Sequence, residues 1–258
     1  MLSAAQIDGF INTGYVCVEQ AFPTEVARRC REMLWKATGC NPNNPATWTR
    51  PVVRIGDMTA EPFRDAANTT ELREAYDQLV GKDNWLPRMS MGTFPIRFPS
   101  TDSANDTGWH VDASFPGEDP ADFLKWRINI HSRGRGLLML FLFSDVGDND
   151  APTRINAGSH LDVARLLAPH GDDGLSFMEV AQALPSLPAR DEAIATGRAG
   201  TVYLCHPFVV HAAQDHHGSQ PKFMAQPPLI SRRDLRVEPG AAQHPVELAI
   251  VKALRAQL

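Results

Sequence analysis

The chain has 258 residues, 43% of them hydrophobic and 21% charged, and its formal net charge is −5. A chain of this length and composition fits one globular domain with a sizeable core, so we expect a single domain over residues 1–258. Proteins that follow nucleic-acid phosphates need clustered Lys and Arg, and an acidic chain does not favour such clusters. We therefore expect no nucleic-acid partner.

Cysteine usage and the distribution of apolar residues bear on the cellular compartment. The cysteines have neither Cys-x-x-Cys spacing nor the density of a disulfide scaffold, which favours reduced thiols in a cytoplasmic protein. The N-terminus has no pattern typical of a signal peptide. No apolar run approaches the roughly 20 residues that a membrane span requires, so we expect no membrane partner. The cysteines are Cys17, Cys30, Cys40 and Cys205.

The first 88 residues are predicted to be mainly helical. Capping residues and glycine stops bound three amphipathic segments, and the extended run 15–18 follows the first of them. An Asn- and Pro-rich loop is expected over residues 41–51. The expected helices begin at Ser3, Thr24 and Thr70 and end near Gly14, Gly39 and Gly81.

From Met89 the pattern changes to short extended segments separated by turn residues, which favours an antiparallel sandwich or barrel. The run 137–143 is apolar on both faces and is predicted to be a buried central strand. Residues 245–258 are expected to form a C-terminal helix. The expected extended segments are 89–98, 109–112, 126–131, 137–143 and 201–204.

A candidate metal site lies in the run Gly108-Trp-His-Val-Asp112. Side chains at positions i and i+2 of a strand leave the same face, so His110 and Asp112 would converge. The best third ligand is His211, which follows the extended run 201–204. Two imidazoles and one carboxylate form the facial triad of a non-haem Fe(II) oxygenase, with coordination positions left open.

The chain has nine histidines, so the alternatives to His110 and His211 need separate assignments. His160, in Gly-Ser-His, is expected to bond a backbone group at a turn. His206 is expected in the core or behind the ligands. His216 and His217 are expected to be solvated loop residues. The three proposed ligands could also be ordinary hydrogen-bonded residues of a barrel that binds no metal.

Thr107-Gly-Trp-His-Val-Asp112, the Gly158-Ser-His160 turn and the His211 segment, in this order, resemble the phytanoyl-CoA dioxygenase family of Fe(II)/2-oxoglutarate oxygenases. The resemblance implies a double-stranded β-helix, a jelly-roll or cupin-like barrel flanked by helices, with iron at its open end. It places helical support at 1–88, the barrel at 89–232 with a helical insertion near 161–188, and a helical tail at 233–258. Residues 152–160 would be a connection.

The resemblance also implies the cofactors and the reaction. Fe(II) would bind 2-oxoglutarate and O2, and decarboxylation of 2-oxoglutarate to succinate would accompany hydroxylation of a C–H bond in a small-molecule substrate. The family usually has an arginine for the 5-carboxylate of 2-oxoglutarate eleven residues after the last histidine ligand, and here that position is Lys222. Lysine offers a single ammonium charge at this position, whereas arginine would offer a planar guanidinium with several hydrogen-bond donors.

The substrate is not specified by these motifs, and the oligomeric state stays open. Arg127 would face the cavity if Ile128 faces the core, and it would then meet an anionic group. Trp109 flanks the metal segment and would either form an apolar wall or pack in the core. A cupin-like metal-dependent isomerase or hydrolase, which needs no 2-oxoglutarate, and a non-catalytic ligand-binding barrel are the alternatives.

Overall fold

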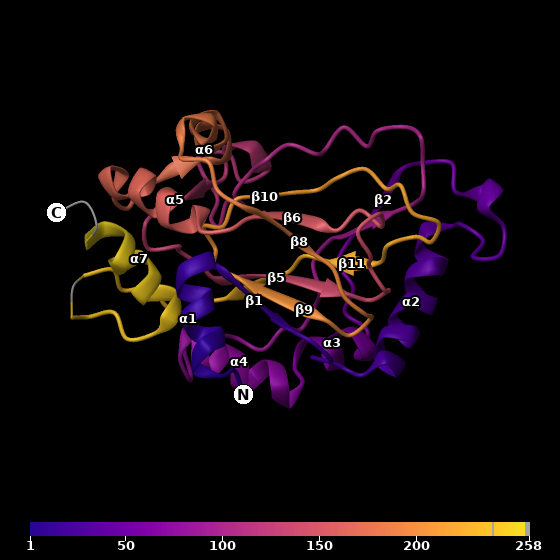
Figure 1. Cartoon of the computed structure of the whole chain (residues 1–258), viewed down its shortest axis with the longest axis horizontal. Helices are drawn as coiled ribbons and strands as arrows, with labels where there is room; N and C mark the ends of the chain where they lie inside the picture. The colour runs from indigo at the N-terminus through magenta and orange to yellow at the C-terminus, as the bar shows by residue number, and fades with distance from the viewer. Residues whose placement is uncertain (239, 256–258) are drawn as a thin grey trace.

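Two antiparallel sheets face each other in the computed structural model, which describes residues 1–238 and 240–255 (Figure 1). Among the described strands the two sheets share no pairing, so they form an open sandwich. The larger sheet has the order β1 (Tyr15–Val18), β9 (Val202–Cys205), β5 (Arg135–Leu142) and β11 (Met224–Ala225), and β12 (Pro228–Ile230) also pairs with β5. The smaller sheet has the order β10 (His211–Ala212), β6 (Thr153–Asn156) and β8 (Glu192–Ala195).

Short strand pairs and 3-10 turns complete the framework. The pairs are β2 (Val52–Ile55) with β3 (Phe94–Arg97) and β4 (Arg127–Ile128) with β7 (Leu175–Ser176). The 3-10 turns are η1 (Pro45–Thr47), η2 (Phe123–Lys125), η3 (Ala168–His170) and η4 (Leu184–Ser186).

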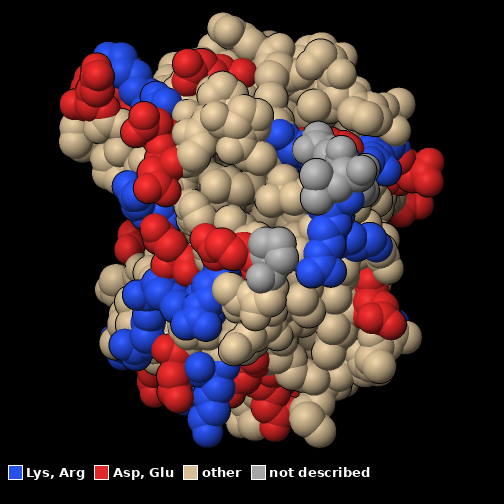
Figure 2. All heavy atoms as spheres, turned by 90° about the vertical axis from the view of Figure 1, so that its left-hand side faces the viewer, with Lys and Arg blue, Asp and Glu red and all other residues tan. Residues whose placement is uncertain are grey.

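Helices cover the outer face of the larger sheet and one end of the sandwich. On the outer face lie α2 (Thr24–Thr38), α3 (Glu61–Ala67) and α4 (Thr70–Val80), while α1 (Ala4–Thr13) packs beside β1 (Figure 1). At the left end of Figure 1 lie α5 (Ser159–Leu167), α6 (Phe177–Ala183) and α7 (Pro245–Arg255). On the surface at that end, Lys and Arg side chains lie next to Asp and Glu side chains (Figure 2).

The central strand β5 is buried along its whole length, as its sequence predicts. Because side chains alternate along a strand, Leu138, Leu140 and Leu142 pack between the two sheets with Ile155 and Tyr203. The side chains of the alternate positions, among them Leu137, Met139 and Phe141, join the core beneath the helices. A strand that is apolar on both faces therefore serves two cores at once.

Capping contacts explain the predicted helix boundaries, and one predicted cap needs correction. Ser3 forms a capping box with Gln6, and Gly14 ends α1 with a left-handed φ of 85°. The N-cap of α4 is Thr69 and not Thr70, because the Thr69 hydroxyl accepts a hydrogen bond from the backbone N–H of Leu72.

Several extended and loop predictions need correction. Residues 152–160 are not only a connection, because 153–156 form β6 of the smaller sheet. Within 89–98 only Phe94–Arg97 is a strand, and within 109–112 only His110 makes a bridge. The mainly helical N-terminal part also supplies β1 and β2. The predicted C-terminal helix is present as α7, and residues 256–258 lie outside the described residues. No helix among the described residues is long and apolar enough to cross a bilayer.

We predict that Leu140→Ala lowers the free energy of unfolding by about 2–5 kcal/mol, because the fully buried side chain leaves a cavity between the sheets. Urea denaturation measures the change. Leu124→Ala is the matched control, since Leu124 is 50% exposed and its loss should cost under about 0.5 kcal/mol. Equal effects of the two substitutions would contradict the assignment of Leu140 to the inner core.

Candidate metal centre

A backbone pairing brings two distant segments together at one end of the sandwich. The N–H of His110 donates to the carbonyl oxygen of His211 at 3.0 Å, and the N–H of His211 donates to the carbonyl oxygen of His110 at 3.0 Å. His211 also lies opposite Ile155 in the pairing of β10 with β6, so both side chains face the interior of the sandwich. The pairing thus fixes His110 against a strand of the smaller sheet.

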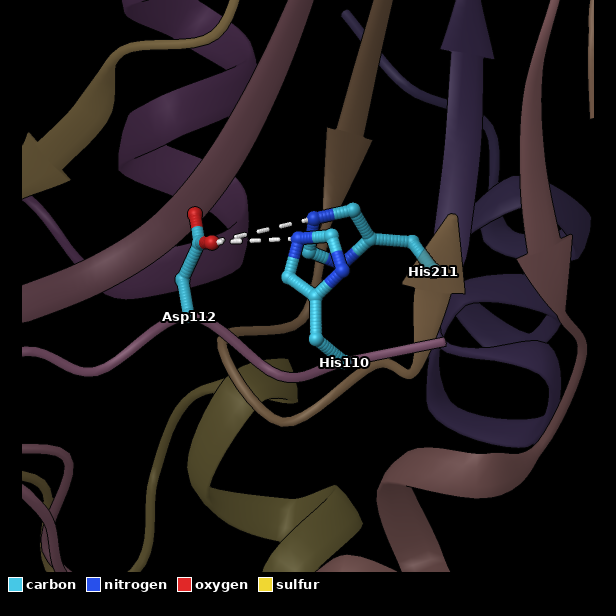
Figure 3. A group of neighbouring side chains, drawn as sticks. All are labelled: His110, Asp112 and His211. Carbon is cyan, nitrogen blue, oxygen red and sulfur yellow. Dashed lines mark ion pairs between the residues drawn. The ribbon is translucent and has the colours of Figure 1, made fainter. Parts of the chain in front are cut away.

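The side chains of His110, Asp112 and His211 converge in front of this pairing (Figure 3). The Oδ1 atom of Asp112 lies 3.7 Å from Nε2 of His110 and 3.8 Å from Nε2 of His211. One ligand atom from each residue lies within 4.8 Å of the others. Ligand bonds of about 2.0–2.2 Å allow two ligand atoms of one metal ion to lie up to about 4.4 Å apart, so the two Asp112 distances fit a shared ion.

The two imidazoles have unprotonated Nε2 atoms because their Nδ1 atoms are engaged by the backbone. Nδ1 of His110 lies 2.9 Å from the carbonyl oxygen of Gly108, and Nδ1 of His211 lies 3.2 Å from that of Val209. A carbonyl oxygen only accepts, so each Nδ1 carries the proton and each Nε2 has a lone pair. Such a partner is typical of metal-binding histidines.

Asp112 is held by an ion pair with Arg135 at the start of β5. Nη1 of Arg135 donates to Oδ2 of Asp112 at 2.9 Å, and Nη2 donates to the carbonyl oxygen of Ala113 at 3.0 Å. Burial alone would raise the pKa of Asp112, but Arg135, His211 and His110 outweigh burial and hold this pKa well below its usual range. Oδ2 is therefore occupied, while the ionised carboxylate presents Oδ1 to the histidines.

The environment of His211 keeps its imidazole neutral. Burial, and then the proximity of His110, lower the pKa of His211 to about 4. The side-chain amide nitrogen of Gln226 donates to Nε2 of His211 at 2.8 Å. A metal ion at Nε2 must displace this amide, so Gln226 lies at the edge of the candidate metal position.

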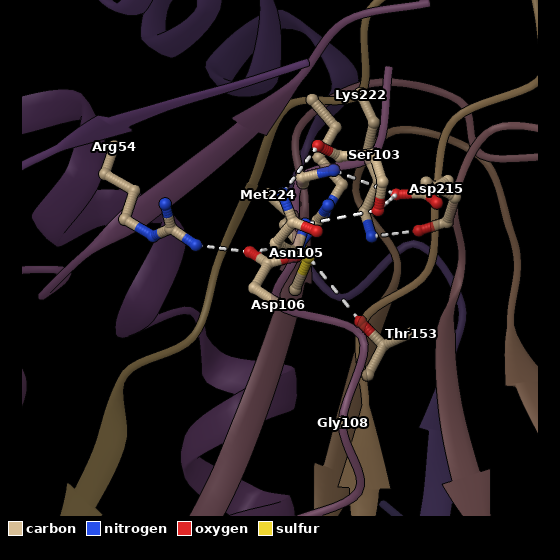
Figure 4. Close-up of polar contacts among 12 residues, drawn as sticks. Arg54, Ser103, Asn105, Asp106, Gly108, Thr153, Asp215, Lys222 and Met224 are labelled. Atoms are coloured by element: carbon tan, nitrogen blue, oxygen red, sulfur yellow. Dashed lines mark hydrogen bonds and ion pairs between the residues drawn. The ribbon is translucent and has the colours of Figure 1, made fainter. Parts of the chain in front are cut away.

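Lys222 lies on the same strand face as Gln226 and Met224, toward the other end of the sandwich interior. Met224 packs in the interior opposite Leu142, and alternation gives Lys222 and Gln226 the same face. Figure 4 shows Lys222 with Met224, Thr153 and Asp106. Lys222 is 1% exposed, and its Nζ donates to the carbonyl oxygen of Ala151.

Lys222 shares this position with a second buried cation. Arg97 pairs with Lys222 across the backbone, and its Nη2 lies 2.8 Å from both oxygens of Asp106, which also pairs with Arg54. Among the described residues no carboxylate lies within 4.0 Å of the Lys222 Nζ. Burial, and then Arg97, lower the pKa of Lys222 to about 7, although Asp106 opposes the shift.

The two candidate substrate residues, Trp109 and Arg127, do not lie on the face that carries the metal ligands. The ring of Trp109 packs under the guanidinium of Arg154, 4.4 Å away, on the outer face of β6. Arg127 donates from Nε to the carbonyl oxygen of Asp173 at 2.7 Å and from Nη2 to that of Gly174 at 2.8 Å. The Arg127 guanidinium therefore holds the loop before β7. A contact between Arg127 and a substrate stays a prediction.

Two of the other histidines lie where the sequence predicted them, and one does not. His160 bonds the carbonyl oxygen of Ile11, and His206 lies fully buried against Val246, as expected. The expectation for His216 is wrong, because its side chain is buried and its Nδ1 accepts a hydrogen bond from the N–H of Gly218. Its local sequence is polar, so burial could not be read from it.

Sequence reasoning missed three residues around the centre: Arg135, Gln226 and Phe177. Arg135 lies in the turn-rich run before the apolar strand, which suggests a solvated residue. Gln226 follows Met224 with the period of a strand, and that alternation with Lys222 was a usable signal. Phe177, whose ring centroid lies 5.8 Å from that of His110, comes from the helical insertion and had no local signal.

The sandwich of antiparallel sheets with its flanking helices is a jelly roll, and solved structures confirm this class. The chain matches no protein-family model, and no curated protein sequence matches it. Many solved structures have the same fold, and the similar ones include Fe/2-oxoglutarate-dependent enzymes. The fold expected from the phytanoyl-CoA dioxygenase resemblance is thus confirmed.

Three of these structures illustrate the likeness. HygX from Streptomyces hygroscopicus, with nickel and 2-oxoglutarate bound, is 15% identical, with 88% of this chain and 86% of that chain covered and a TM-score of 0.54. EctD from S. alaskensis, with 2-oxoglutarate and 5-hydroxyectoine, is 19% identical, with 89% and 76% covered and a TM-score of 0.56. The epimerase SnoN, with Fe3+, alpha ketoglutarate and nogalamycin RO, is 15% identical, with 86% and 80% covered and a TM-score of 0.56.

We predict that Arg135→Lys weakens Mn(II) binding roughly 10- to 100-fold, because it keeps the charge but loses the planar contact that orients Asp112. Calorimetric titration of the protein with Mn(II) measures the dissociation constant. Arg28→Lys, on the exposed surface of α2, is the control and should bind Mn(II) like the parent. An unchanged dissociation constant for Arg135→Lys would show that Asp112 needs no such support.

Proposed function

We propose that the protein is an Fe(II)- and 2-oxoglutarate-dependent oxygenase that hydroxylates a C–H bond of a small molecule, and that it is cytoplasmic. The observation that carries this proposal is the convergence of His110, Asp112 and His211 at one end of the jelly roll. All four cysteines are free, in keeping with a reducing compartment. Structures of this fold contain iron or nickel together with 2-oxoglutarate, which supports the choice of cofactors.

In this proposal the three side chains hold Fe(II) through two Nε2 atoms and Oδ1. Fe(II) held there would supply, with 2-oxoglutarate and O2 as cosubstrates, the oxidising power for hydroxylation, and succinate and carbon dioxide would be the co-products. Arg135 keeps Asp112 ionised and directs its Oδ1 toward the ion. The carbonyl oxygens of Gly108 and Val209 hold the histidine rings in the tautomer that binds a metal.

Lys222 is the proposed partner of the 5-carboxylate of 2-oxoglutarate. Lys222 and Gln226 lie four residues apart on one extended face, about 13 Å of strand, with Gln226 at the metal end. Lys222 thus places a buried cation on the same interior face as the residue next to the triad. Lys222 and Arg97 bring two positive charges to this end, and Asp106 supplies one negative charge. A ligand carboxylate would offset the excess charge.

Enzymes of similar fold catalyse more than one type of reaction, since the solved structures include an epimerase and the carbocyclase SnoK. We therefore propose hydroxylation on the basis of the family resemblance. Analysis of the reaction product tests this choice. Incorporation of 18O from labelled O2 into the product identifies hydroxylation. Inversion or ring closure without the label would identify the other outcomes.

We predict that anaerobic parent protein binds one Mn(II) and then 2-oxoglutarate, and that His110→Ala, Asp112→Ala and His211→Ala lose both binding steps while remaining folded. Loss of a direct ligand should exceed the roughly 10- to 100-fold cost of disturbing its support. Calorimetry measures both steps, and His217→Ala, on an exposed loop, is the control. Metal binding without 2-oxoglutarate binding would favour the isomerase or hydrolase alternative. No metal binding would favour the non-catalytic barrel.

We predict that Lys222→Ala weakens 2-oxoglutarate binding roughly 10- to 150-fold at saturating Mn(II), from the loss of a charged hydrogen bond worth about 1.5–3 kcal/mol. Lys222→Arg should retain much of the affinity. The matched control is Lys36→Ala, on the exposed surface of α2. If Lys222→Ala binds 2-oxoglutarate like the parent, another residue holds the 5-carboxylate.

The same titrations as a function of pH give a second measurement on Lys222. The pKa of Lys222 is about 7 without ligand, and a bound carboxylate raises it, so the complex takes up a proton. Affinity should be highest below pH 7 and fall as pH rises from 7 to 9. Lys222→Arg stays protonated and should show a flat profile there. A parent profile as flat as that of Lys222→Arg would contradict the pairing.

A further inference from the structure

The triad is open on the side of His110. The side chain of His110 is 25% exposed, whereas that of His211 is 2% exposed. The ring of Phe177, the first residue of α6, lies beside His110 at a centroid distance of 5.8 Å. Phe177 therefore flanks the exposed side of the candidate metal position.

Aromatic rings continue from Phe177 to the surface. The ring of Phe123 in η2 lies 5.7 Å from that of Phe177, and the ring of Trp126 lies 5.6 Å from that of Phe123. The N–H of Phe177 donates to the carbonyl oxygen of Trp126 at 2.8 Å, which fixes η2 against α6. We call Phe123, Trp126 and Phe177 the aromatic ladder.

The surface around the aromatic ladder is unusually apolar. Phe123, Leu124 and Met178 are 45%, 50% and 43% exposed, and they lie in η2 and α6, which pack on each other. Large apolar side chains gathered at the surface of a soluble protein typically mark a binding site. The ring contacts of Phe177 with both Phe123 and His110 connect this surface to the exposed side of the triad.

The charges near the aromatic ladder are already paired. Nζ of Lys125 lies 3.4 Å from Asp119 and 3.6 Å from Asp122. Arg127 bonds two backbone carbonyl oxygens, and its Nη1 lies 3.8 Å from Glu179. Lys125 and Arg127 thus already face carboxylates, so an anionic substrate would gain little from either cation, and the attraction that this surface offers is chiefly apolar.

We propose that the substrate of the metal centre is an uncharged molecule with an aromatic or similarly flat apolar portion, which packs on Phe177 and Phe123. This inference rests on the proposed function, because it takes the triad as the reacting centre. Aromatic rings pack on one another in offset or edge-to-face arrangements, which the exposed ring of Phe123 and the partly exposed ring of Phe177 allow. The apolar portion would thus be held next to the metal without an ion pair, in contrast to the role first expected of Arg127.

Fluorine NMR of small probes tests this substrate class. The probes are 4-fluorobenzyl alcohol, which is neutral and aromatic, 4-fluorobenzenesulfonate, which has the same ring with a negative charge, and 3-deoxy-3-fluoroglucose, which is neutral and polar. Protein loaded with paramagnetic Mn(II) and 2-oxoglutarate is compared with protein loaded with diamagnetic Zn(II). Broadening specific to Mn(II) shows that a probe binds near the metal.

We expect Mn(II) to broaden the neutral aromatic probe most. Phe177→Ala and Phe123→Ala should each weaken its binding about 2- to 10-fold, the size of one aromatic contact. Leu248→Ala, an exposed apolar residue of α7, is the control and should leave the broadening unchanged. Equal or stronger broadening of the charged ring or the sugar overturns the inference, as does wild-type binding by both phenylalanine variants.

Failure of the proposed function would give a different experimental result from failure of this inference. Absence of Mn(II) binding by calorimetry would contradict the metal centre itself. Saturation transfer from metal-free protein to 4-fluorobenzyl alcohol still measures the aromatic ladder in that case. A signal that Phe177→Ala reduces supports the ladder as a binding surface, and a signal that does not change overturns it.

Discussion

The centre depends on the reciprocal backbone hydrogen bonds between His110 and His211. These bonds join a loop segment to a strand of the smaller sheet at one residue on each side. Together with the contacts of Arg135 to Asp112 and Ala113, they fix the loop that carries Asp112, so that its Oδ1 lies 3.7 and 3.8 Å from the two histidines. Each imidazole is then oriented by a carbonyl oxygen two residues before it, so the local backbone sets the ring as well as the position.

The separation of buried charges toward the two ends of the sandwich is a second constraint. Arg135 lies beside the triad and neutralises Asp112, while Lys222 lies toward the other end without a carboxylate in contact among the described residues. Met224 lies on the same strand face as Lys222, and the Thr153 hydroxyl contacts its sulfur at 3.6 Å. Because a buried lysine loses its charge more readily than an arginine does, the proposed binding of a carboxylate at Lys222 would depend on pH in a way that binding at an arginine would not.

The sequence predicted those features that depend on local rules. The caps at Ser3 and Gly14 bound α1, the apolar run 137–143 indicated the central strand, and two-residue spacing placed His110 with Asp112. The fold class came from the family resemblance and was confirmed by solved structures.

The features that sequence reasoning missed depend on partners distant in the chain. β6 has only four residues and gains its order from β8 and β10. His216 is polar in local context but buried by the segments that surround it. Arg135 contacts Asp112 and Phe177 contacts His110 through tertiary packing, and no local period marks either residue.

The most direct measurement of the central claim is the visible absorption of anaerobic protein with Fe(II) and 2-oxoglutarate. Chelation of Fe(II) by the 1-carboxylate and 2-keto oxygens produces a metal-to-ligand charge-transfer band, which succinate cannot produce because it has no keto group. We expect the band in the parent protein only when both Fe(II) and 2-oxoglutarate are present, and no band in Asp112→Ala. A parent protein without the band at saturating concentrations, or an Asp112→Ala protein with the same band, would contradict the assignment of His110, Asp112 and His211 to one iron site.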